Sequence, residues 1–156
     1  MSPDQMNQLL QIAAHLQAQA KQYMAMDNLE GELQSLRQCV GILSQLLQAT
    51  RSHETCLELY QVRGDLLGSL LLAGETESAI VECEYVVAFL VSILCDQDAS
   101  HCPNHPILGL QLFTLGDLYS AVGWEDNAQK IFAWARTILM VSHGNESKMV
   151  QLLRDR

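Results

Sequence analysis

Two cysteines and two histidines that could together bind a zinc ion fall within one short polar stretch: Cys95, His101, Cys102 and His105. Zinc sites usually draw their cysteine ligands from closely spaced pairs. Here the spacing is C-x5-H-C-x2-H, and the adjacent His101 and Cys102 are badly placed to share one ion. Cys95 also fits the end of an apolar helix. We therefore expect neither a metal site nor a cofactor.

The other candidate for chemistry is His143, which directly precedes Gly144. A histidine can act as a general base, but no acid or nucleophile accompanies His143 at a useful spacing. In the last turn of a helix a histidine instead interacts favourably with the helix dipole. None of the 5 cysteines is favoured as a nucleophile over a role in core packing. We expect a chain without catalytic machinery.

The charge of the chain limits its partners. The sequence has 18 acidic and 9 basic residues, for a formal net charge of −9. Binding to a phosphate backbone needs clustered lysine and arginine, so we expect no nucleic-acid partner. No signal-peptide pattern opens the chain, and its apolar stretches are too short to span a bilayer. These features predict no membrane partner and a cytoplasmic or nuclear location.

The elements that must position these side chains are all predicted to be helices. Apolar residues recur at helical spacing through most of the chain, and only 3 prolines are present. No segment alternates apolar and polar residues at a period of two. We expect an all-α fold, with about seven helices stacked as antiparallel pairs in one domain over 1–156. The predicted parts are a first pair over 2–48, a second pair over 52–95, a third pair over 105–143 and a C-terminal helix over 145–155.

The third pair carries the spacing of a tetratricopeptide repeat. In this pattern Gly116 allows the two helices to approach closely, Gly123 makes the turn and Ala128 sits at the crossing. The pattern comprises Leu115, Gly116, Tyr119, Gly123, Ala128, Phe132 and Ala135. The same skeleton begins 49 residues earlier and includes Leu66, Gly74 and Ala79. The first pair has no glycine in its turn and no small residue recognised at its crossing, so it is interpreted as a degenerate pair that caps the stack.

In tetratricopeptide proteins, the first helix of each pair lines a concave groove. The corresponding residues of the second and third pairs are Gln61, Asp65, Gly68, Leu110, Thr114, Asp117 and Ser120. These positions offer two aspartates and no base, which disfavours capture of a C-terminal carboxylate. A basic or apolar protein segment is the better candidate ligand. The alternative is that Asp65 and Asp117 are ordinary solvated surface residues.

A family resemblance rests on residues 104–144 and extends at the level of pattern over nearly all of the chain. The run from His105-Pro106 through Leu115-Gly116 to His143-Gly144 resembles the C-terminal helical domain of SMYD proteins. That family combines a SET lysine-methyltransferase domain with a MYND zinc finger, and the signatures of both are missing here. The resemblance therefore implies a non-catalytic module that binds protein. The alternative is a structural domain that packs against its own SET lobe and forms one wall of the substrate cleft.

Overall fold

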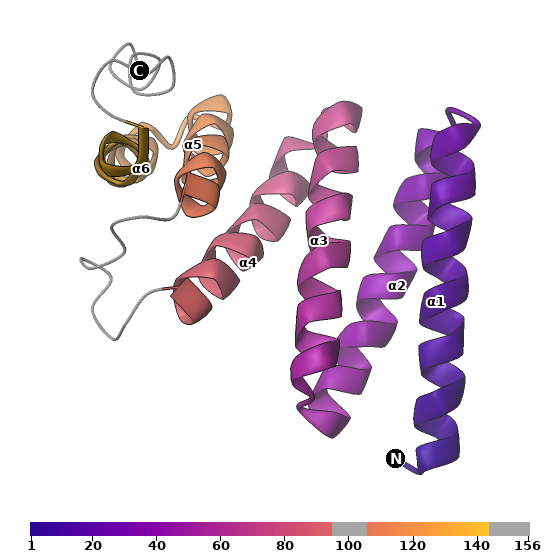
Figure 1. The fold of residues 1–156 in the computed structure, drawn as a ribbon. Coiled ribbons are helices and arrows are strands. Elements are labelled where there is room, and N and C mark those ends of the chain that lie inside the picture. The colour runs from indigo at the N-terminus through magenta and orange to yellow at the C-terminus, as the bar shows by residue number, and fades with distance from the viewer. Residues whose placement is uncertain (95–105, 144–156) are drawn as a thin grey trace. The chain divides into compact units, whose positions relative to one another are not determined.

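The computed structural model describes residues 1–94 and 106–143, and all regular elements in these ranges are α-helices (Figure 1). The six helices are α1 (Pro3–Ala25), α2 (Leu29–Thr50), α3 (His53–Ala73), α4 (Thr76–Leu94), α5 (Pro106–Ala121) and α6 (Glu125–His143). The predicted all-α class is confirmed for this part of the chain.

Some of the predicted features lie outside the described residues. These are the helix over 145–155 and the cluster of Cys95, His101, Cys102 and His105. The backbone of His143 ends α6, but its side chain is not described. The zinc, histidine and seventh-helix predictions therefore stay predictions.

The chain divides into two compact units, Met1–Glu75 and Thr76–Arg156. In the first unit α1 packs against α2, and α2 packs against α3. In the second unit α4 packs against α5, and α5 packs against α6. The boundary falls inside the predicted second pair over 52–95, so that pair and the single domain over 1–156 both stay predictions.

The first helix begins at a capping box, which explains its sharp start. The Ser2 hydroxyl accepts a hydrogen bond from the Gln5 amide at 3.2 Å, and the Gln5 side chain accepts one from the Ser2 amide at 3.0 Å. Pro3 occupies the first turn, where a missing N–H leaves no hydrogen bond unmade. At the start of α2 the side chain of Asn28 accepts from the Gly31 amide at 3.0 Å. Both starts satisfy backbone donors that a helix leaves unpaired.

The turns after α1, α3 and α5 share one backbone geometry. In each turn one residue adopts a left-handed conformation: Asp27 at φ 54°, Gly74 at φ 73° and Gly123 at φ 84°. The next amide donates back to the helix that is ending: Asn28 to Tyr23 at 2.8 Å, Glu75 to Leu70 at 3.1 Å and Trp124 to Tyr119 at 2.8 Å. This is the Schellman pattern of helix termination. The first turn thus has the geometry of the other two, although it contains no glycine.

In the second unit, the predicted repeat residues form the contact between α5 and α6. A Cβ placed on Gly116 would lie 2.5 Å from Cε1 of Phe132, so the backbone of α5 touches the ring of α6 directly. Ala128 and Ala135 are completely buried, and Leu115 and Phe132 are almost so. Tyr119 is half-buried. Small residues therefore allow these two helices to pack closely.

The first unit has its own close contact between α1 and α2, which sequence reasoning missed. A Cβ on Gly31 would lie 2.7 Å from Cδ1 of Tyr23. The thiol of Cys39 donates to the backbone carbonyl of Ala13 at 3.5 Å, and both residues are completely buried. Small residues on both helices therefore allow close contacts in this pair, whose interpretation as a degenerate repeat stays a prediction.

Candidate partner-binding groove

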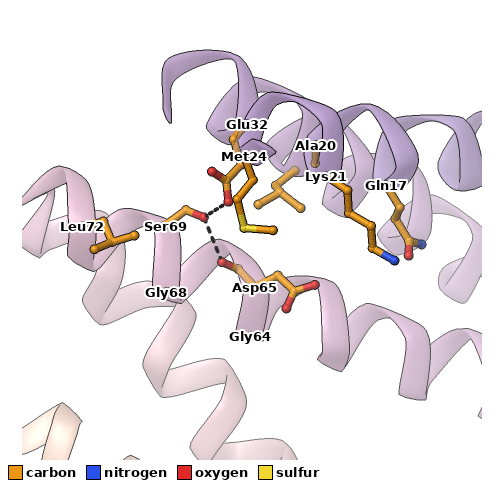
Figure 2. Close-up of a pocket in the computed structure, with 11 residues that line it drawn as sticks. Gln17, Ala20, Lys21, Met24, Glu32, Gly64, Asp65, Gly68, Ser69 and Leu72 are labelled. Carbon is orange, nitrogen blue, oxygen red and sulfur yellow. Dashed lines mark hydrogen bonds between the residues drawn. The ribbon is translucent and has the colours of Figure 1, made fainter. Parts of the chain in front are cut away.

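A depression in the first unit collects part of the predicted groove (Figure 2). We call it the α1–α3 depression, because those two helices form its sides while α2 contributes to its lining. Its volume is about 420 Å³. It is lined by Gln17, Ala20, Lys21, Met24, Glu32, Leu36, Gly64, Asp65, Gly68, Ser69 and Leu72.

The spacing of the lining residues explains why they meet. On α1 and α3 they recur three and four positions apart, which places them on one face of each helix. The amide of Gln17 on α1 donates to Glu58 on α3 at 2.8 Å. A side-chain bridge thus holds the two walls together beside the depression.

A second hydrogen bond ties α3 to α2. The buried Ser69 hydroxyl lies 2.6 Å from Oε1 of Glu32 and 3.2 Å from the backbone carbonyl oxygen of Asp65 (Figure 2). A hydroxyl carries one proton, and the shorter contact is the one to the carboxylate. The Glu32 carboxylate is therefore anchored to the wall of the depression.

Asp65 is the predicted groove residue with the most perturbed surroundings. Partial burial raises the pKa of its carboxyl above the ordinary value, and the negative charge of Glu32 raises it further. The positive charge of Lys21 opposes both effects without cancelling them. Asp65 is nonetheless exposed, so water screens much of this repulsion.

Lys21 adds a base to the depression that the predicted groove positions did not include. Sequence reasoning took groove positions only from the second and third pairs, whereas Lys21 comes from α1 in the first pair. The structure brings Lys21, Glu32 and Asp65 to one depression, two carboxylates against one ammonium group. The net charge of the lining remains negative, so Lys21 weakens but does not reverse the expected preference for a basic ligand.

Gly64 and Gly68 lie one turn apart on α3 and expose its backbone to the depression. A Cβ on either residue would meet no atom within 4 Å. Neighbouring packing therefore does not require glycine here, in contrast to Gly31 and Gly116. In a helix interior, glycine is less favourable than alanine by about 1 kcal/mol per residue.

The remaining predicted groove residues lie elsewhere. Gln61 is exposed on α3 but does not line the depression. The other four lie on α5 in the second unit: Leu110, Thr114, Asp117 and Ser120. Thr114 donates to the Leu110 carbonyl at 3.1 Å, and Ser120 donates to Glu125 at 2.9 Å. A continuous groove along all seven residues stays a prediction.

Buried cysteines in both units have pKa values that keep them protonated. Burial raises the pKa of Cys39 to about 11 and that of Cys83 to about 12. A thiol rather than a thiolate is a poor nucleophile and a poor metal ligand. Among the described residues, no three histidine, cysteine, aspartate or glutamate side chains are grouped as metal ligands.

Comparison with known proteins assigns no function to the chain, so a functional proposal has to rest on the sequence and on the geometry described above. No model of a known protein family matches the chain, and no curated protein matches it. Within residues 1–94 and 106–143, none of the helices is both long and apolar enough to cross a membrane.

Proposed function

We propose that this chain is a non-catalytic protein-interaction module of the tetratricopeptide type, with the α1–α3 depression as its binding surface. The observation that carries the proposal is the composition of the depression. It combines an exposed carboxylate at Asp65 with exposed helix backbone at Gly64 and Gly68. Such grooves between first helices are where repeat proteins of this type receive peptide segments.

The same proposal places the chain with the C-terminal helical domain of the SMYD family. Its support is the sequence resemblance over 104–144. On this proposal, the methyltransferase activity of such a protein belongs to SET and MYND segments and not to this chain, which acts in the cytoplasm or nucleus. The sequence of the parent transcript tests the relationship, because SET and MYND segments preceding residue 1 would establish it.

A library of random peptides displayed on phage and selected on the full chain tests the interaction function. We expect the selection to converge on a common motif, and the synthetic peptides to bind the chain in fluorescence anisotropy. If the selection yields no common motif although circular dichroism shows that the chain is folded, a peptide-binding role is contradicted.

A second candidate function is a structural domain that packs against a SET lobe. It is favoured by exposed apolar side chains on the rim of the depression, since Met24 is 58% and Leu72 is 81% exposed. An isolated domain with such a surface is expected to self-associate. Sedimentation of the purified chain tests this: concentration-dependent association that Leu72→Glu abolishes supports it, and a monomer at all concentrations contradicts it.

A further inference from the structure

The side chains that line the α1–α3 depression carry one more negative than positive charge, so one additional cation would balance them. Lys21 is the single base among the residues that line it, against the two carboxylates of Glu32 and Asp65. Glu32 already accepts the Ser69 hydroxyl, whereas Asp65 is exposed to solvent in the lining of the depression, where an approaching cation can reach its carboxylate. An added positive charge beside Asp65 would complete the balance. An added negative charge would face two carboxylates and be repelled.

The shape of the depression favours a ligand whose backbone comes close to α3. Because Gly64 and Gly68 have open space where a Cβ would stand, a bound chain can approach the helix backbone there. At the rim, Met24 on α1 and Leu72 on α3 offer exposed apolar surface. A ligand with apolar side chains next to a charged one would match both features.

We propose that the α1–α3 depression binds a lysine or arginine side chain of an amphipathic segment of another protein. Asp65 accepts the hydrogen bonds of the cation, the segment crosses α3 at Gly64 and Gly68, and its apolar neighbours cover Met24 and Leu72. This inference rests on the proposed interaction function and names the class of partner.

The proposal predicts opposite changes in binding affinity for variants of Lys21 and of Asp65. It competes with the incoming cation for Asp65, since its charge already stabilises that carboxylate. Removing the Asp65 charge should therefore weaken a basic ligand, and removing the Lys21 charge should strengthen it. A surface that bound only through apolar contacts would respond to neither change.

The experiment uses the full chain and the selected phage peptides, synthesised with their lysine or arginine intact, replaced by neutral citrulline or glutamine, or replaced by glutamate. We expect selected motifs to contain a basic residue flanked by apolar ones. A hydrogen bond to a charged group is worth about 1.5–3 kcal/mol, so the neutral peptides should bind roughly tenfold or more weakly. Asp65→Asn should cause a similar loss, and Lys21→Gln should increase affinity for the basic peptides.

Glycine variants provide a second readout with a matched control. Gly64→Ala and Gly68→Ala should weaken binding, because each adds a methyl group where the segment crosses. Gly41→Ala on α2 adds the same group in equally open space, but Gly41 does not line the depression. It should leave affinity unchanged.

Three results would overturn the inference. Selection of acidic motifs would show that the depression prefers an anionic ligand, opposite to the proposal. Equal binding of basic peptides to wild type and Asp65→Asn would show that Asp65 does not accept their hydrogen bonds. Loss of binding in Asp117→Asn but not in Asp65→Asn would move the site to α5, which would overturn the α1–α3 depression as the binding surface but not the interaction function itself. If no peptide motif is selected at all, the proposed function fails together with the inference.

Discussion

Gly116 of α5 lies directly against the ring of Phe132 on α6, with no space between them for even a methyl group. A Cβ at position 116 would stand 2.5, 2.6 and 2.9 Å from three atoms of that ring. Phe132 is buried, so the ring can move aside only by disturbing its neighbours. This contact sets how closely the two helices pack.

Gly116→Ala should therefore destabilise the chain by about 1–3 kcal/mol, the usual effect of overpacking a core. Urea unfolding followed by circular dichroism measures the change. The companion variant Phe132→Leu, made in the Gly116→Ala background, should recover part of the loss because it replaces the ring. An unchanged midpoint for Gly116→Ala would contradict the close contact.

Glycines on α3 should respond in the opposite direction. Gly64→Ala and Gly68→Ala meet no neighbouring atom, and alanine is the better helix former. Each should stabilise the chain by about 1 kcal/mol. Gly41→Ala is the matched control, because a Cβ there also meets no atom within 4 Å, and it should stabilise the chain by the same amount. A decrease in the free energy of unfolding for Gly64→Ala alone would reveal a contact that the structure does not contain.

Helical periodicity and the L-G-x-x-Y pattern were enough to predict the all-α class. These signals succeed because they depend on local sequence: one apolar face per helix and a left-handed residue at each turn. The prediction that Gly116 permits close approach rests on the same pattern, and its Cβ position lies against Phe132.

The first pair matches the third in its turn and in part of its residue pattern. When Asp27 is aligned with Gly123, Ala20 takes the place of Gly116, Tyr23 that of Tyr119 and Cys39 that of Ala135, whereas the unlike Gln19 and Glu32 stand at Leu115 and Ala128. Backbone conformation, not residue type, is what the three turns share. Allowing aspartate at the left-handed position would have predicted the geometry of the turn after α1.

The composition of the depression could not be read from the sequence. Lys21 and Asp65 are far apart in the chain, and the bridge from Gln17 to Glu58 depends on where α3 lies relative to α1. The open space at Gly64 likewise depends on what the neighbouring helices leave uncovered. Periodicity identifies the face of a helix but not the side chains that oppose it.

Asp27 holds a left-handed conformation that an L-residue with a side chain adopts at a penalty. Because glycine adopts this conformation freely, Asp27→Gly should stabilise the chain by about 1 kcal/mol. Gly123→Ala places a side chain in the corresponding position after α5 and should destabilise by a similar amount. Thermal unfolding of the two variants checks both signs. Destabilisation by Asp27→Gly would mean that interactions of the aspartate side chain stabilise the fold by more than the left-handed backbone conformation destabilises it.

Tyr119 should titrate at unusually high pH. Burial raises the pKa of its hydroxyl, and so does Glu84, which accepts its hydrogen bond at 2.8 Å; together they bring the pKa to about 12. The folded state keeps this proton above pH 10, where the unfolded state loses it. The resulting stabilisation is present below pH 10 and is lost as pH rises toward 12.

Tyrosinate absorbance measures this pKa as the difference between wild type and Tyr119→Phe. The difference should titrate near pH 12 rather than pH 10, and Glu84→Gln should move it toward 10. A difference curve that is the same with and without Glu84 would rule out the carboxylate as a cause.

Removing the charge of Asp65 should weaken peptide binding without lowering the stability of the fold. Its folded-state pKa is raised, so its contribution to stability is present below the unfolded pKa and is lost as the pH rises through the folded value. At neutral pH the ionised carboxylate therefore does not stabilise the fold, and Asp65→Asn should leave the urea midpoint unchanged or slightly higher. Carboxyl NMR titration should show a lower pKa for Asp65 in Glu32→Gln and a higher one in Lys21→Gln. If Asp65→Asn instead lowers the midpoint clearly, the carboxylate is a structural residue, and any loss of peptide binding in that variant would reflect damage to the fold.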